Sequence, residues 1–306
     1  MTYLEALTIR LAQGAAELPE AMRQRQGDWL LAQQRPDGGF AGREGGSDLY
    51  YTAFALRSLM ILGLLDGEPA DRAAEFLKLR LQGREAIIDL ISLIMAAKML
   101  EISSGIDVMQ SANGGWQDAI AELLETLRRE DGGYAKSPEG RAGSTYQTFL
   151  TLLCYELIER SPPEPRQIEA FIRGQAQVEG GFLEIRVGKR AGVNPTAAAI
   201  GALRVLQRLD EPTQQLTTEF LAEMQINDGG MTANTRIPIA DLLSTCTAIV
   251  TLTDLQSLDQ IDRAAATRYV HSMERPGGGF AGFEMDPTED VEYTFYGLAA
   301  CSLLSL

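Results

Sequence analysis

Six basic side chains stand out in the loops of an acidic chain. Each loop follows a glycine-rich turn and precedes an apolar segment that we expect to form a helix. Bases beside the N-terminal N–H groups of a helix would form an anion site, and a diphosphate fits such a site. Solvated surface bases are the alternative. The six are Lys136, Arg141, Arg186, Lys189, Arg190 and Arg236.

Carboxylates form the second set of candidates. Asp48, Asp89, Asp241 and Asp290 each lie four residues before a recurring register position, where a helix is expected to begin. A carboxylate there caps free N–H groups and opposes the helix dipole. Asp241 and Asp290, with Tyr293, are also the candidates for a catalytic role.

Further acidic residues surround the first and last of these helix starts. Such a cluster could bind Mg²⁺ or Ca²⁺, hold one proton at a raised pKa, or form a solvated acidic rim. The residues are Glu44, Glu284, Asp286, Glu289 and Glu292.

The elements that position these side chains are repeated along the chain. Triplets of two glycines followed by an aromatic residue or methionine begin at Gly38, Gly132, Gly180, Gly229 and Gly278, with spacings of 94, 48, 49 and 49. The double opening gap indicates a copy that has lost its triplet. Residues 89–98 match residues 48–57 and supply the helix of that copy. The register positions are Thr52, Leu93, Thr148, Thr196, Thr245 and Thr294.

An amphipathic segment precedes each turn, and a segment that is apolar nearly all round follows it. The first pattern is typical of an outer helix and the second of a helix buried on all sides. Six such pairs without strand-like alternation predict an all-α protein: an (α/α)6 barrel, or toroid, of six helix-pair repeats, with residues 1–306 forming one domain.

Composition narrows the possible partners and the compartment. A net charge of −15 repels nucleic acid and anionic membrane surfaces. The N-terminal segment does not resemble a secretory signal, and no apolar run is long enough to span a bilayer. The three cysteines lack CxxC spacing, which favours reduced thiols and therefore the cytoplasm.

The repeat resembles that of the protein prenyltransferase β subunits over essentially the whole chain, most closely the Rab-modifying geranylgeranyl branch. The resemblance rests on residues 34–42 (QRPDGGFAG), 225–230 (QINDGG) and 273–287 (MERPGGGFAGFEMDP), with residues 48–52 (DLYYT). Squalene and diterpene cyclases share a related repeat. The resemblance implies a toroid that binds an isoprenoid diphosphate, a zinc ion that activates the acceptor thiolate, and a partner α subunit.

This sequence departs from the zinc-binding pattern. The resemblance places the Asp, Cys and His ligands at Asp241, Leu243 and Tyr293, so two of the three are replaced. The only histidine, His271, is expected on an outer helix, and Cys246 with Asp241 would be a poor zinc site. We therefore expect no zinc, whereas Mg²⁺ could accompany a diphosphate substrate.

Aromatic side chains near the loop ends of the buried helices could line a cavity for an isoprenoid tail or simply pack in the core. The candidates are Tyr50, Tyr51, Phe54, Tyr146, Phe149 and Phe295.

The function stays open between three hypotheses at this point. The first is a prenyltransferase β-subunit-like protein that binds an isoprenoid diphosphate and transfers the prenyl group, without zinc, to a hydroxyl or amine, with Asp241 or Asp290 as base. The second is a non-catalytic toroid that binds a lipid or a partner protein. The third is a terpene-cyclase-like enzyme, although the Asp-x-Asp-Asp motif is absent. A zinc prenyltransferase with a remodelled site is a weaker alternative.

Overall fold

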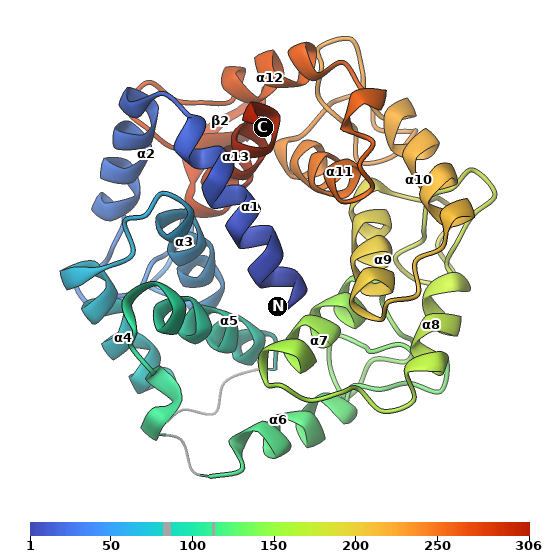
Figure 1. The fold of residues 1–306 in the computed structure, drawn as a ribbon, viewed down its shortest axis with the longest axis horizontal. Coiled ribbons are helices and arrows are strands. Elements are labelled where there is room, and N and C mark those ends of the chain that lie inside the picture. The colour runs from blue at the N-terminus through green and yellow to red at the C-terminus, as the bar shows by residue number, and fades with distance from the viewer. Residues whose placement is uncertain (82–86, 112–113) are drawn as a thin grey trace. The chain divides into compact units, whose positions relative to one another are not determined.

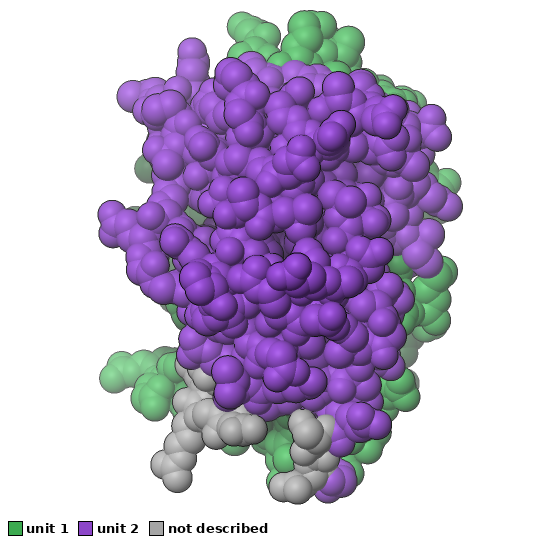
Figure 2. Space-filling view, turned by 90° about the vertical axis from the view of Figure 1, so that its left-hand side faces the viewer, with its two compact units in different colours: residues 1–5, 117–270 green, residues 6–116, 271–306 purple. Residues whose placement is uncertain are grey.

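The computed structural model describes residues 1–81, 87–111 and 114–306. Its described residues divide into two compact units, which are coloured separately in Figure 2. Unit 1 comprises residues 1–5 and 117–270, and unit 2 comprises residues 6–116 and 271–306. This division does not test whether residues 1–306 form one domain, which stays a prediction.

Unit 1 is built from buried and amphipathic helices that alternate along the chain. Figure 1 labels these helices. The buried helices pack side by side in the order α7, α9, α11, and α8 and α10 lie against this layer. The bounds are α6 Trp116–Glu125, α7 Thr145–Leu157, α8 Pro165–Arg173, α9 Val193–Val205, α10 Glu211–Glu223, α11 Leu242–Asp254, the 3₁₀ turn η2 Leu258–Gln260, and α12 Arg263–Ser272. The unit boundaries fall within α6 and α12.

Unit 2 has the same plan, with α13, α3 and α5 side by side and α2 and α4 packed against them. Its elements are α2 Glu20–Ala32, α3 Leu49–Ile61, α4 Gly67–Leu81, α5 Ile87–Ser104, the 3₁₀ turn η1 Val108–Ser111, β1 Phe280–Phe283, β2 Asp286–Asp290 and α13 Val291–Ser305. The chain begins with α1 Tyr3–Glu17, most of which belongs to unit 2. The predicted helix pairs are therefore confirmed in each unit.

Two local expectations were wrong. β1 and β2 pair in antiparallel orientation, although the sequence shows no strand-like alternation there. The two strands lie in the segment that forms the turn and loop before the buried helix in the other repeats. They form because the backbone of this segment pairs with itself. Asp89 is the third residue of α5 and not its cap, because that helix begins at Ile87. Its carboxylate still lies in the first turn, where it opposes the helix dipole.

The register threonines hold each turn on the helix that follows it. In five repeats the backbone N–H of the third triplet residue donates to the threonine Oγ1, over 2.9–3.1 Å. The hydroxyl donates in turn to the carbonyl four residues earlier. All five threonines, Thr52, Thr148, Thr196, Thr245 and Thr294, are fully buried.

Leu93 occupies the register position of the second repeat and is also buried. A leucine has no hydroxyl with which to bind a turn, in agreement with a sequence that lacks the triplet in this copy. Residues 82–86, where the missing triplet would fall, lie outside the described residues.

Glycine is required in the triplets for two reasons. The first glycine of Gly180-Gly181 has φ +91°, and a Cβ there would lie 2.1 Å from the Leu216 carbonyl oxygen on α10. The second glycine faces the Phe220 ring of the same helix, 2.6 Å from a Cβ position. The other triplets have the same arrangement, with the rings of Trp29, Phe76, Phe171 and Tyr269.

Candidate functional site

Asp241 and Asp290 are helix caps, as the sequence predicts. Asp241 Oδ1 accepts a hydrogen bond from Ser244 N–H (2.7 Å) at the start of α11, and Oδ2 accepts one from the Ser244 hydroxyl (2.8 Å). Burial raises the pKa of Asp241, while the bonds from Ser244 oppose this shift. Asp290 caps α13 through Tyr293 N–H (2.8 Å) and is largely buried. Both carboxylates are therefore engaged in holding helix starts.

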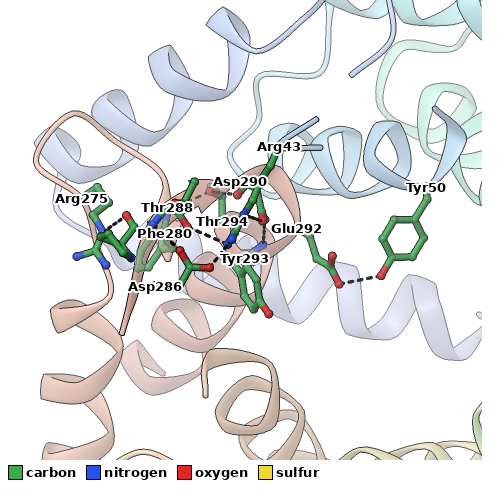
Figure 3. Close-up of polar contacts among 11 residues, drawn as sticks. Arg43, Tyr50, Arg275, Phe280, Asp286, Thr288, Asp290, Glu292, Tyr293 and Thr294 are labelled. Carbon is green, nitrogen blue, oxygen red and sulfur yellow. Dashed lines mark hydrogen bonds and ion pairs between the residues drawn. The ribbon is translucent and has the colours of Figure 1, made fainter. Parts of the chain in front are cut away.

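Arg43 binds the acidic residues of the β1–β2 hairpin (Figure 3). Its guanidinium pairs with Asp290 through Nε (2.9 Å) and with Asp286 through Nη1, and it donates to the Thr288 carbonyl (2.9 Å). The Arg43 guanidinium holds the pKa of Asp286 below its usual value. Part of the predicted acidic cluster is thus neutralised by a base from the neighbouring loop.

Tyr293 packs against its own turn. A Cβ at Gly282 would lie 2.5 Å from the Tyr293 ring, and the Arg43 guanidinium lies 5.7 Å from the ring centroid. Tyr51 has the same position in the first repeat, one residue before the register threonine, and its ring lies equally close to Gly42. Tyr293 therefore has a structural explanation where the resemblance places a histidine.

The zinc positions do not supply a ligand set. In α11, Asp241 is bound by Ser244, Leu243 has no donor atom, and Cys246 is buried. His271 lies on α12, as expected, where Nδ1 is 3.5 Å from Glu274. Within the described ranges, no group of three or more His, Cys, Asp or Glu side chains is arranged to hold a metal ion. These side chains therefore do not fit the zinc ion that the resemblance to the prenyltransferase β subunits implies.

Glu292 is a carboxylate that the sequence-based choice of catalytic residues missed. It lies in the first turn of α13, and its Oε1 accepts hydrogen bonds from the hydroxyls of Tyr50 (2.7 Å) and Tyr296 (3.2 Å). Figure 3 shows the Glu292 and Tyr50 side chains pointing toward each other from α13 and α3. Burial raises the pKa of Glu292, the bond from Tyr50 lowers it, and the nearby charge of Asp290 raises it, with a net rise.

A signal for Glu292 was present in the register. The residue lies two positions before Thr294, the position that Leu243 has before Thr245 and Tyr50 before Thr52. This repeat position contains the residue that the resemblance assigns to the cysteine ligand, so an acid there is a candidate for chemistry.

Aromatic rings surround Glu292 in unit 2. The Phe54 ring lies at the centre, with centroid distances of 5.0 Å to Tyr50, 5.6 Å to Phe295 and 5.4 Å to Tyr296. Tyr51 contacts Tyr50 at 5.3 Å. The Arg57 guanidinium lies 3.9 Å from the Phe295 centroid. The structure thus brings together four of the six predicted cavity residues, with Tyr296 and Tyr293 beside them, and we call these six the aromatic cluster.

The other two predicted cavity residues lie on α7 in unit 1. Phe149 packs edge-on against Tyr3 (5.8 Å), and a Cβ at Gly201 would lie 2.6 Å from its ring. Tyr146 is 40% exposed. Phe149 is half-buried and Tyr146 faces solvent, and their role in lining a cavity stays a prediction.

The six predicted diphosphate ligands are all exposed, in three consecutive loops of unit 1. The loops are connected through the helix starts: Thr145 N–H donates to the Glu184 carbonyl and Val193 N–H to the Ala233 carbonyl. Arg190 donates to the Thr235 hydroxyl (3.2 Å). Side chains cap two of the three helix starts, Ser144 on α7 and Asp241 on α11, whereas Gly192 at the start of α9 offers no side-chain cap. The role of the six basic side chains as diphosphate ligands stays a prediction.

The repeated helix pairs, the glycine turns and the threonine register define an all-α protein of the helical-repeat class. The sequence matches the family described as prenyltransferase alpha-alpha toroid domain over residues 3–232 and 196–306. The chain belongs to this family, which confirms the predicted toroid fold and the resemblance to the prenyltransferase and squalene cyclase superfamily.

Solved structures of this fold resemble the chain at low sequence identity. The type II terpene cyclase MstE from Scytonema is 14% identical with a TM-score of 0.64, covering 97% of this chain and 98% of that chain. A variant of that cyclase has been solved in complex with its substrate geranylgeranyl dihydroxybenzoate. Candida albicans protein geranylgeranyltransferase-I complexed with GGPP is 16% identical with a TM-score of 0.56, covering 97% of this chain and 83% of that chain. At these identities the likeness shows the fold alone.

No curated protein matches the sequence. In the described part of the chain, no helix has the length and apolar character needed to cross a membrane.

Proposed function

We propose that the chain binds an isoprenoid through the aromatic cluster of unit 2 and that Glu292 carries a proton in a reaction there. The observation that supports this most directly is a carboxyl group held by two tyrosine hydroxyls, at 2.7 and 3.2 Å, beside aromatic rings in edge-to-face contact. Asp241 and Asp290, the sequence-based candidates for the base, already serve as helix caps.

The chemistry of the cluster suits an isoprenoid. Aromatic faces offer apolar contact to a branched hydrocarbon, and their negative quadrupole stabilises positive charge that develops on an allylic carbon. Burial raises the pKa of Glu292, and the hydroxyls of Tyr50 and Tyr296 hold its carboxyl group in place to exchange a proton with a bound substrate. Family membership and the isoprenoid ligands of the two neighbours support the same substrate class.

In the first form of the reaction, the chain is a prenyltransferase that does not use zinc. The hydroxyl or amine of the acceptor forms a bond to the allylic carbon, the carbon–oxygen bond to diphosphate breaks, and the Glu292 carboxylate takes the acceptor's proton. The diphosphate leaves as an anion, which Mg²⁺ would accompany.

A second form uses the hydrogen-bonded Glu292 carboxyl as an acid. A protonated carboxyl could donate its proton to an alkene carbon, forming a carbon–hydrogen bond and leaving a tertiary cation that closes a ring or loses a proton. This would be a cyclase-like activity without the Asp-x-Asp-Asp motif.

The test combines binding with turnover. We expect calorimetric titration to detect farnesyl and geranylgeranyl diphosphate, and Phe54→Ala to weaken both by about tenfold because a buried aromatic contact is lost. Glu292→Gln should retain binding and abolish product formation, followed by mass spectrometry with hydroxyl and amine acceptors. Glu284→Gln, at an exposed carboxylate of the β1–β2 hairpin that precedes α13, is the matched control and should behave like wild type.

The outcomes separate the alternatives. Binding without any product would favour a non-catalytic toroid that holds a lipid. Product formation that is unchanged in Glu292→Gln would contradict the role of this carboxyl. No binding at high micromolar ligand would contradict the proposal as a whole. A partner α-type subunit and a cytoplasmic location are part of the same proposal; three cysteines that form no disulfide agree with that compartment.

A further inference from the structure

Two adjacent loops of unit 1 present bases and aliphatic side chains together to solvent. We call residues 185–190 and 236–239 the rim patch. Ile185, Val187, Ile237 and Ile239 are 39%, 82%, 44% and 43% exposed, although exposed aliphatic residues usually occur singly. Arg186, Lys189, Arg190 and Arg236 are exposed among them.

A tight backbone turn lies in each loop of the rim patch. Gly188 N–H donates to the Ile185 carbonyl (2.8 Å), which puts Arg186 and Val187 at the tip of a tight turn. Ile237 N–H donates to the Asn234 carbonyl (3.2 Å), so Arg236 lies at the tip of a second turn. The hydrogen bond from Arg190 to Thr235 joins the two loops into one surface.

The two loops carry a net positive charge, whereas the chain as a whole is negatively charged. Residues 183–192 and 232–240 contain four bases and one acid, whereas the whole chain contains 27 bases and 42 acids. The single acid, Glu184, is partly buried and hydrogen-bonded to the Ser144 hydroxyl. The net charge of −15 therefore does not describe this surface, which would attract anions.

We infer that the rim patch docks the protein on an anionic lipid bilayer. Bases bind lipid phosphates electrostatically, and protruding aliphatic side chains enter the boundary between headgroups and acyl chains. Val187 lies at a turn tip and the three isoleucines flank the turns, so aliphatic side chains alternate with the bases, an arrangement that suits a soft, flat, anionic surface. This inference does not depend on the proposed function, because it uses none of the residues of the aromatic cluster.

Cosedimentation with lipid vesicles tests the inference. We expect the protein to sediment with phosphatidylcholine vesicles that contain phosphatidylserine, to bind pure phosphatidylcholine vesicles much less, and to be released by high salt. Each base near an anionic surface strengthens partitioning about fivefold, so Arg186→Gln with Arg190→Gln should weaken it roughly thirtyfold. Val187→Ser with Ile237→Ser should weaken it about tenfold.

Matched controls lie elsewhere on unit 1. Val178 is 97% exposed, and Arg166 is exposed on α8. Val178→Ser and Arg166→Gln should leave vesicle binding unchanged, and unchanged melting temperatures would show that every variant is folded.

Several results would overturn the inference. These are no binding to phosphatidylserine vesicles, equal losses in the control variants, or binding that is insensitive to the aliphatic substitutions. Release by millimolar inorganic diphosphate, but not by sodium chloride of the same ionic strength, would instead assign the bases to a free-anion site and would also overturn it.

Discussion

Replacing Thr245 by valine tests whether the register threonine holds its turn by hydrogen bonding. Valine has nearly the same shape, so the substitution removes only the hydroxyl. Met231 N–H then loses its acceptor at 2.9 Å, and the Asp241 carbonyl loses a donor at 2.7 Å. Both Thr245 and Met231 are fully buried, so water cannot replace the hydroxyl.

The cost is that of one buried N–H group without a partner, about 1–3 kcal/mol. The Asp241 carbonyl also accepts the Thr245 backbone N–H (3.0 Å), so it keeps a partner and adds little. A chain of this size should melt roughly 1.5–2 °C lower for each kcal/mol. Thr245→Ser keeps the hydroxyl and should lose only about 1 kcal/mol through its missing methyl group.

Thermal and urea unfolding, followed by circular dichroism, would measure these differences. Thr253→Val on the same helix is the control, because the Thr253 hydroxyl is partly exposed and binds only the Ile249 carbonyl within α11. It should change stability by less than about 0.5 kcal/mol. If Thr245→Val were as stable as wild type, or no worse than Thr253→Val, the hydroxyl would not be what holds the turn.

Three further predictions concern a glycine turn, a buried glutamine and the Glu292 carboxyl group. Gly180→Ala should cost more than about 2 kcal/mol of unfolding free energy, because the Cβ meets the Leu216 carbonyl; Gly63→Ala, at φ +71° in open space, should cost only about 1 kcal/mol, and equal losses would refute the steric argument. Gln26→Ala should cost about 1–3 kcal/mol in urea unfolding, because the buried Gln26 amide accepts Gly279 N–H at 2.7 Å, whereas exposed Gln24→Ala should be neutral. The pKa of Glu292 is higher in the folded state, so the folded protein binds the proton more tightly and loses stability as pH rises from the unfolded-state pKa through the folded-state pKa. Glu292→Gln removes this loss, so its melting temperature should gain on wild type between pH 4 and neutrality, and a constant difference across that range would contradict the raised pKa.

The sequence alone determined the repeat and most of its local chemistry. A spacing of 48 or 49 residues, glycines in turns that need φ above zero, and Asp48, Asp241 and Asp290 before apolar segments each reflect a local requirement of the backbone. Together with the family resemblance, the same register places the substituted zinc positions at Leu243 and Tyr293. Such features are readable because their causes lie within a few residues of one another or recur at a fixed period.

Tertiary structure decided which side chains meet. Glu292 and Tyr50 are 242 residues apart in the chain, and Arg43 and Asp290 are 247 apart. Composition suggested an acidic cluster. Only the packing of α13 against α3 gives its members different partners, because Arg43 binds Asp290 whereas tyrosines among aromatic rings bind Glu292. A carboxylate's role depends on its desolvation and its partners, and both are set by elements that the chain brings together only when it folds.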